Sequence, residues 1–332
     1  MKNLIMIVAF AFSVLMVGCS KDDTSVVTSA KSELGISSIT ISQSTRSLVT
    51  SFASGTEDGK GIGVFVNGNL YTPMVARYTF DGTSWNAPGD DASKIFLSNE
   101  TATVYGFYPS NSLVSGALIN DGTSKINVSV PATESSFDAT GQIDYMYATA
   151  PSADSNVTYP LATATNATAT NKQKVDLVFH HALSKLTFVV NRSSSYTGTG
   201  TLAQLQLTSG GTLFSTGDGT MNVADGVIAL PGTSTNLTFT GSNLINALTA
   251  PISTTPTVQA LVAPLGSTSS ITLLLTVDTK VMSVVLPTSV AASWIPSKNY
   301  IYTVTVNGTG LIVNSVTIQD WTDTPSGSVG VS

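Results

Sequence analysis

The feature that most constrains the fold of this chain is a two-residue hydrophobic period, which returns in short runs along much of its length. Apolar and polar residues alternate in 126–130, 203–207, 271–277 and 316–318. This alternation places the apolar side chains on one face of a β-strand. Tight turns between such runs are indicated by Asp-Gly pairs at 81–82, 121–122, 218–219 and 225–226. The sequence therefore predicts an all-β fold.

The composition agrees with strands and excludes a class of partner. Charged residues make up 10% of the chain, against about 25% in an average soluble domain. Lys and Glu, which cover the exposed faces of helices, are correspondingly few. The net charge of −6 argues against nucleic acid as a partner, because phosphate binding requires a basic surface.

A low-complexity segment divides the chain. Residues 161–171 are uncharged, rich in Ala, Thr and Asn, and nearly free of large apolar groups, so they predict a linker or a long exposed loop. The boundary placed here separates an N-terminal β-sandwich domain, 47–172, from a C-terminal one, 173–332. The apolar positions change from odd to even numbers within 175–190, which predicts a bulge or strand break at the His-Ala-Leu-Ser stretch.

The N-terminus has the features of a secretory signal peptide. Lys2 precedes an apolar run, 4–17, that is short for a membrane span and is followed by Gly18 and Cys19. Cys19 is the only cysteine, so an internal disulfide is excluded. The run Leu-Met-Val-Gly-Cys resembles the lipobox of bacterial lipoproteins, which implies cleavage after residue 18 and lipidation of Cys19. A free or dimerising thiol is the alternative.

No set of residues indicates catalysis, and we expect no enzyme, no metal and no cofactor. His180 and His181, the only histidines, are strand neighbours that point to opposite faces and cannot converge on one metal. A structural role is favoured for both. Trp85 could form a platform for a sugar ring, although packing in the core is the more common role of tryptophan.

The chain resembles the fimbrillins, the pilin subunits of Bacteroides-type anaerobes. The resemblance rests on ordered motifs spread over nearly the whole chain: the lipobox, Thr45-Arg46, Gly61–Phe65, Thr103–Pro109, Asp144–Ala148, Val175–Val190, Trp294–Val306 and Val316–Trp321. One departure is Ser297, where the family commonly has Gly; we expect a small cost if the turn is type I.

The resemblance implies a function for Arg46. In fimbrillins, two tandem β-sandwich (transthyretin-like) domains follow a lipidated leader, here 19–46, and a trypsin-like protease cuts after an arginine. Arg46 matches that position, which leaves Ser47 as the new N-terminus. Removal of the leader strand opens a groove that a strand of another fimbrial subunit fills.

The residues before Arg46 fit this scheme. Ile36, Ile39 and Ile41 would form a removable strand, and the small polar residues 42–45 would form an accessible loop. The alternative is that Arg46 is a solvated loop residue of an uncleaved lipoprotein.

The donor strand of stalk subunits in this family is C-terminal, and 311–321 fits that role, with Ile312, Val316 and Ile318 expected on one face. A tip subunit needs no donor strand, and its last strand would belong to its own sheet. The sequence leaves both cases open.

Two functions follow as hypotheses. The first is a fimbrial stalk subunit or tip adhesin, exported to the outer membrane and cell surface as a lipoprotein (palmitate on Cys19) and assembled into a fimbrium. Its partners would be other fimbrial subunits, the processing protease and a host or bacterial surface ligand. The alternative is a surface-anchored glycan-binding lipoprotein that is not polymerised, with Trp85 at its site.

Overall fold

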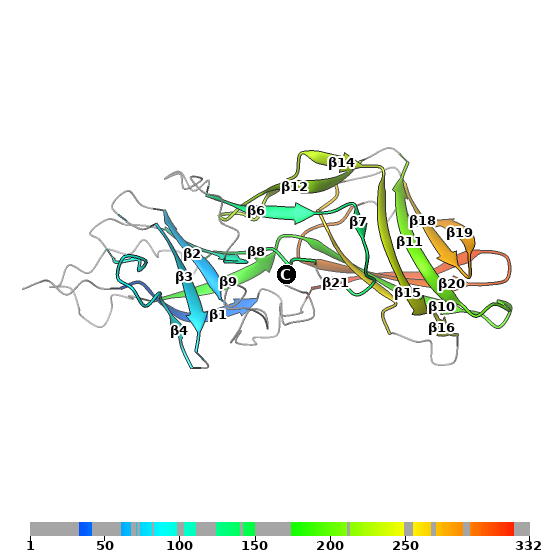
Figure 1. The fold of residues 1–332 in the computed structure, drawn as a ribbon, viewed down its shortest axis with the longest axis horizontal. Helices are drawn as coiled ribbons and strands as arrows, with labels where there is room; N and C mark the ends of the chain where they lie inside the picture. The colour runs from blue at the N-terminus through cyan, green and yellow to red at the C-terminus, as the bar shows by residue number, and fades with distance from the viewer. Residues whose placement is uncertain are drawn as a thin grey trace, which may run out of the picture. The chain divides into compact units, whose positions relative to one another are not determined.

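The computed structural model describes residues 33–41, 61–67, 71, 74–81, 83–97, 103–110, 124–139, 142–149, 174–210, 213–248, 255–266, 270–287 and 293–321. Every regular element in these ranges is a β-strand (Figure 1). The same ranges contain no helix that is long and apolar enough to cross a membrane. The prediction of an all-β fold is confirmed.

The first strands close into a barrel. Its order is β1-β4-β3-β2-β5-β8-β9, and β9 returns to β1. The pairs are antiparallel except β1–β9, which is parallel. The strands are β1 (Gly35–Ile41), β2 (Ile62–Asn67), β3 (Val75–Phe80), β4 (Trp85–Asn86), β5 (Thr103–Tyr108), β8 (Met146–Thr149) and β9 (Lys174–His181).

One hydrophobic core lies within the barrel, and two further sheets enclose a second one. The first contains β16 (Asn246–Ala247), β10 (Ser184–Arg192), β20 (Lys298–Val306) and β21 (Leu311–Asp320), with β17 (Val258–Val262) also paired to β10. The second has the order β19 (Lys280–Val285), β18 (Ile271–Val277), β11 (Thr201–Ser209), β15 (Asn236–Leu244) and β7 (Thr133–Glu134). Their facing side chains form one apolar cluster, which includes Phe188, Leu205, Leu273 and Tyr302.

A fourth sheet joins early and late parts of the chain. In it, β6 (Lys125–Val130) and β13 (Ile228–Ala229) pair with β12 (Phe214–Asn222), and β12 pairs with β14 (Gly232–Ser234) as well. Because β6 precedes β8 and β9 in the sequence, the chain leaves the barrel region and returns to it. Apolar side chains of β6 and β12 then share a third core with Phe65 and Phe107 of the barrel strands.

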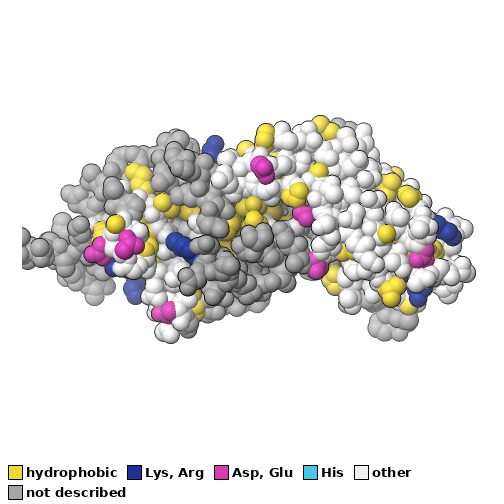
Figure 2. Space-filling view, in the orientation of Figure 1, with side chains coloured by type: hydrophobic (Ala, Val, Ile, Leu, Met, Phe, Trp, Pro, Cys, Tyr) yellow, Lys and Arg dark blue, Asp and Glu magenta, His cyan; other side chains and the backbone are white. Residues whose placement is uncertain are grey.

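The low charge of the sequence is visible on the surface. Figure 2 shows one face on which charged side chains are sparse and most of the described area is uncharged. The strands build this surface from Ser, Thr, Asn and Gln on their outward positions, as on β11, where Gln204 and Gln206 lie opposite Thr240 and Thr238.

The strand break predicted within 175–190 is confirmed. β9 ends at His181 and β10 begins at Ser184, so the apolar positions change parity across Ala182 and Leu183. At this break the chain passes from the barrel to the next sheet. The predicted boundary at residue 172 thus lies ahead of β9, a strand that pairs with β1 and β8; the division into two β-sandwich domains stays a prediction.

Two local predictions were wrong. Ala203 is exposed and Leu202 is buried, because a register irregularity between Leu202 and Gln204 interrupts the alternation on β11. Ser297 has a φ of 62°, in the left-handed region. Both central residues of a type I turn have negative φ, so this turn is not type I. A glycine would fit the backbone at this position with less strain.

The enclosed core predicts a clear contrast between two apolar truncations. Leu205→Ala, deep in the core, should lower the free energy of unfolding by about 2–5 kcal/mol. Val281→Ala, on an exposed position of β19, should change it by no more than about 0.5 kcal/mol. Urea unfolding followed by circular dichroism measures both, and equal effects would contradict the observed packing.

Candidate functional site: the leader strand and its groove

The strand that precedes Arg46 is built into the barrel. β1 runs parallel to β9 from Gly35, opposite Lys174, to Ile41, opposite Phe179. The register shifts once, between Ile36 and Ser38, where the extra residue forms a bulge. One wall of the barrel is therefore supplied by the predicted leader.

The apolar side chains of β1 point into the barrel. Ile36, Ile39 and Ile41, together with Leu34 just before the strand, are all buried. They share a core with Val175, Leu177 and Phe179 of β9. Burial of such a side chain contributes about 1.5–3 kcal/mol. Without β1, these apolar residues of β9 would face an open groove.

The opposite edge of β1 is weakly paired. The only pair that joins β1 to β4 is Ile36 with Trp85. At its N-terminal end, the backbone N–H of Leu34 donates to the carbonyl of Ile95 at 2.9 Å. The buried Tyr78 hydroxyl donates to the carbonyl of Leu34 at 2.5 Å. These contacts, a β-bridge between Glu33 and Phe96, and the pairing with β9 contribute to holding the strand.

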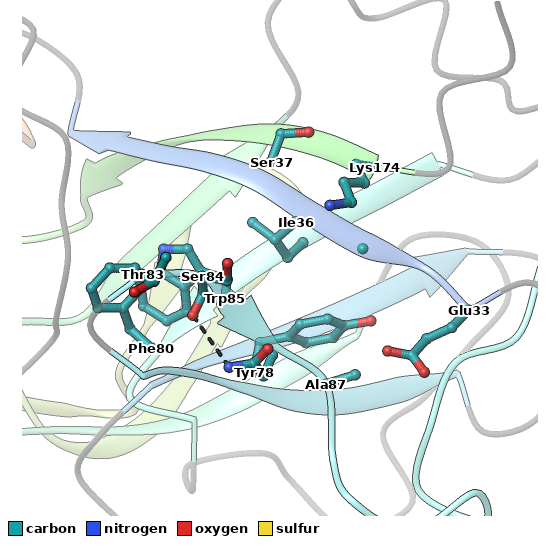
Figure 3. Close-up of a pocket in the computed structure, with 12 residues that line it drawn as sticks. Glu33, Ile36, Ser37, Tyr78, Phe80, Thr83, Ser84, Trp85, Ala87 and Lys174 are labelled. Carbon is teal, nitrogen blue, oxygen red and sulfur yellow. Dashed lines mark hydrogen bonds between the residues drawn. The ribbon is translucent and has the colours of Figure 1, made fainter. Parts of the chain in front are cut away.

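A cavity opens along this weak seam. It has a volume of about 480 Å³ and lies between β1 and the β3–β4 turn (Figure 3). Glu33, Ile36 and Ser37 line it from the leader side, and Phe80 and Trp85 line it from the other. Because β1 contributes one wall, the cavity in this form requires β1 to be in place.

Trp85 is part of this seam, but it is not an exposed platform. Its side chain is buried, and its ring lies 5.5 Å from that of Phe80 at an interplanar angle of 47°. The interpretation of Trp85 as a core residue is thus supported. The glycan-binding hypothesis loses the exposed ring on which it depended.

Polar contacts also hold β1 and the residue Glu33 that precedes it. Lys94 forms ion pairs with Glu33 and Asp91, each at 3.2 Å. The Ser38 hydroxyl donates to a carboxylate oxygen of Asp176 on β9 at 2.6 Å. The second contact fixes the register of β1 against β9, since it joins neighbouring positions of the two strands.

The predicted lipidation and cleavage residues lie outside the described residues. This applies to Cys19, Arg46 and Ser47, and their roles stay predictions. The structure does describe the strand that ends shortly before Arg46.

The predicted face of the C-terminal strand requires a correction. β21 pairs with β20 along its length, with a register shift between Val313 and Ser315 that leaves Asn314 as the extra residue. Ile312 therefore lies opposite Thr305, on the other face from Val316 and Ile318. Leu311, Val313 and Val316 of β21 instead pack against the core. Ile318 lies on the same face, opposite Tyr300, but is 46% exposed.

Trp321, just after β21, is anchored in the third core. It is 2% exposed, and its ring stacks on His181 with centroids 3.8 Å apart and planes 8° apart. The Lys185 ammonium lies 5.8 Å from the centre of the same ring. The backbone N–H of Trp321 donates to the carbonyl of Ser297 at 2.9 Å, so side chain and backbone both secure the end of the strand.

The two histidines do not converge. Nδ1 of the buried His181 lies 2.9 and 3.0 Å from the two carboxylate oxygens of Asp144. His180 instead stacks on Tyr147, with ring centroids 5.4 Å apart. Among the described residues, no group of three His, Cys, Asp or Glu is placed to hold a metal ion.

Sequence reasoning missed two residues that position these strands. The Tyr78 hydroxyl donates to the carbonyl of Leu34, just before β1, yet in the sequence Tyr78 is only one of several aromatic residues in strand-like runs. Asp144 partners His181 across 37 positions, and its place in the Asp-Tyr-Met-Tyr-Ala motif was the one available signal.

Comparison with known proteins identifies the family. The model of the family described as fimbrillin-like matches residues 45–321. The chain belongs to the fimbrillin-like family. This family consists of fimbrial and cell adhesion proteins, so the expectations of a fimbrillin and of a non-enzyme are confirmed. No curated protein sequence matches this fimbrillin-like chain.

Solved structures share the fold. A proposed cell adhesion protein from Bacteroides ovatus is 17% identical, with a TM-score of 0.59 over 88% of this chain and 98% of that chain. Another from Bacteroides uniformis is also 17% identical, with a TM-score of 0.54 over 87% and 99%. A third, from Parabacteroides distasonis, is 12% identical, with a TM-score of 0.50 over 88% and 97%.

The hydrogen bond from Tyr78 predicts how firmly a cut leader is retained. Tyr78→Phe removes the donor to Leu34, a loss of about 1–3 kcal/mol, so the leader peptide should dissociate roughly ten times faster after cleavage. Tyr302→Phe is the control, since that hydroxyl accepts from Trp294 in the other core. Size-exclusion chromatography of the cut protein over time measures retention; equal dissociation from both variants would contradict the assignment.

Burial also makes the barrel sensitive to alkali. Burial, with the charge of Glu33 as a second cause, raises the pKa of Tyr78 well above its usual value. An unfolded chain loses this proton near pH 10, so above that pH the unfolded state binds fewer protons than the folded state. The free energy of unfolding should therefore fall by about 1.4 kcal/mol per pH unit for each such tyrosine. Urea unfolding between pH 9 and 11 should show a smaller slope for Tyr78→Phe than for the natural chain.

Proposed function

We propose that this chain is a subunit of a fimbrium, exported as a lipoprotein and activated by proteolysis. In this scheme Cys19 carries the lipid, a trypsin-like protease cuts after Arg46, and Ser47 becomes the N-terminus. A strand from another fimbrial subunit then fills the groove left by β1. The subunit is thereby transferred from the outer membrane to the fimbrium at the cell surface.

One observation carries this proposal. The strand that ends shortly before Arg46 is a wall of the barrel, with Leu34, Ile36, Ile39 and Ile41 in its core. A cut after Arg46 would leave this strand held by non-covalent contacts alone. Its loss would expose the apolar face of β9 and a row of unpaired backbone groups, which favour pairing with a new strand.

The asymmetry of β1 supports removal of this strand in particular. Its pairing with β4 is limited to Ile36 and Trp85, so separation on that side breaks little backbone pairing. The main attachment is to β9, whose parallel register an incoming strand can reproduce. The buried Trp85 leaves no observation that favours a glycan-binding lipoprotein.

The processing step can be tested on the natural protein. Fimbriae are sheared from cells, and the intact mass and N-terminal sequence of this chain are determined. We expect a chain that begins at Ser47 and carries no lipid. Arg46→Ala should instead yield a chain that begins at lipidated Cys19 and stays with the membrane.

Lys31→Ala is the matched control. Lys31 is another basic residue of the predicted leader, but cleavage there would leave β1 in place. This variant should be processed like the natural chain. A natural chain that begins at lipidated Cys19 in sheared fimbriae would overturn the cleavage scheme.

A further inference from the structure

The two sides of β9 make different contacts with β1. Val175, Leu177 and Phe179 lie in the barrel core together with the isoleucines of β1. Lys174 and Asp176 alternate with them and point outwards, where Lys174 is exposed and Asp176 is partly buried. These two outward side chains therefore meet a neighbouring strand at positions that the core does not contact.

The apolar side of the β1–β9 pair does not by itself define which strand fits. Side chains alternate with a period of two along a strand, so a displacement by two residues keeps every apolar side chain on the same face. Several runs of this chain, such as 126–130 and 271–277, have the same alternation. The core contacts alone consequently leave the choice of strand open.

Asp176 supplies a contact that distinguishes one strand from another. One of its carboxylate oxygens accepts a hydrogen bond from the Ser38 hydroxyl at 2.6 Å, and a bond to an ionised acceptor is about twice as strong as a neutral one. In the part of the chain that the structure describes, this hydroxyl is the one donor to the Asp176 side chain. A strand with an apolar residue at this place would cover the carboxylate without replacing the donor, which costs binding free energy.

Lys174 limits the side chain at the start of the strand. It lies opposite Gly35, beside the start of β1 (Figure 3), and a Cβ added at Gly35 would be 2.8 Å from its Cγ. The φ of Gly35 is outside the left-handed region, so this position needs glycine for room and not for backbone conformation. A larger residue fits here only when the Lys174 side chain turns away.

We infer that Asp176 and Lys174 determine which strand the barrel accepts beside β9: one with a hydroxyl residue opposite Asp176 and no side chain opposite Lys174. The inference rests on the proposed function and names the chemistry of the strand that fills the groove. That strand is extended and parallel to β9, with the pattern Gly-Ile-x-Ser/Thr-Ile-x-Ile in the register of residues 35–41. A strand that fills the core but lacks the hydroxyl binds less tightly.

A double-mutant cycle with synthetic peptides tests the contact at Asp176. The full chain is cut by limited trypsin digestion, the trypsin is inhibited, and a fluorescent peptide of residues 32–46 is titrated against it by fluorescence anisotropy. Ser38→Ala in the peptide should weaken binding to the natural cut chain about tenfold, since a hydrogen bond to a charged group is lost. On a cut chain with Asp176→Ala, the natural and Ser38→Ala peptides should bind equally.

Further variants separate the chemistry of this contact from the shape of the strand. A Ser38→Thr peptide keeps a hydroxyl and should regain most of the affinity. Thr40→Ala is the matched control, because Thr40 lies on the same outward side but opposite Val178; its effect should be the same on both cut chains. Asp176→Asn keeps the shape of the side chain without its charge, and should reduce the difference between the natural and Ser38→Ala peptides without abolishing it.

A second cycle tests the contact at Lys174. A Gly35→Ala peptide should bind the natural cut chain more weakly than the natural peptide does. On a cut chain with Lys174→Ala, which removes the atoms that the added methyl group would meet, the two peptides should bind equally. A loss that persists on Lys174→Ala overturns the assignment of this position to Lys174.

The outcomes separate this inference from the proposed function. If no peptide binds the cut chain, or if the uncut chain binds the natural peptide equally well, cleavage opens no groove, and the proposed function fails together with the inference. If the natural peptide binds only the cut chain, but Ser38→Ala costs as much on Asp176→Ala as on the natural chain, the groove remains and the inference is overturned. A Ser38→Ala peptide that binds the natural cut chain as tightly as the natural peptide overturns it as well.

Discussion

The parallel pairing of β1 with β9 is the interaction on which the barrel depends. Along this line β1 contributes its backbone hydrogen bonds and the side chains of Ile36, Ile39 and Ile41. All other neighbouring strands of the barrel pair in antiparallel fashion. β1 closes the barrel between β9 and β4, and it pairs with β4 at one residue pair only. A barrel closed in this way is complete, yet it contains one wall that is easily separated from its neighbour on one side.

The junction between the barrel and the sheets beyond it depends on the break after β9. At Ala182 and Leu183 the chain passes from one sheet to the next, and these two residues join the third core with Trp321. His181, the last residue of β9, stacks on Trp321 and is held by Asp144. The buried His181–Asp144 pair is costly to separate, because removal of either side chain leaves the polar group of the other buried without a hydrogen-bond partner. The end of β21 and the end of the barrel are thereby joined through one histidine.

Much of the fold could be predicted from local pattern. The alternation at Ile126, Val128 and Val130, and the change of parity before Leu186, depend on side chains within one strand, so a sequence displays them directly. The bulge at Asn314 depends on the pairing of β21 with β20. The positive φ of Ser297 occurs where its hydroxyl donates to the carbonyl of His181, a residue distant in the sequence. The same holds for Tyr78, whose importance comes from the carbonyl of Leu34 on a distant strand. A strand that contains Ile36, Ile39 and Ile41 was predicted from the sequence and is present as β1; its parallel pairing with β9 was not predicted.

The proposed cleavage would change how β1 is attached to the chain and would leave its contacts unchanged. Burial of Leu34, Ile36, Ile39 and Ile41 contributes about 1.5–3 kcal/mol for each side chain, and this contribution does not depend on the peptide bond after Arg46. While that bond is intact, a β1 strand that separates from β9 stays close to the groove and returns to it, because the linkage keeps its effective concentration high. After a cut, the same strand would be a separate peptide, and its return would depend on its concentration in solution. Under the proposed function, cleavage therefore favours a replacement strand without weakening any contact inside the barrel.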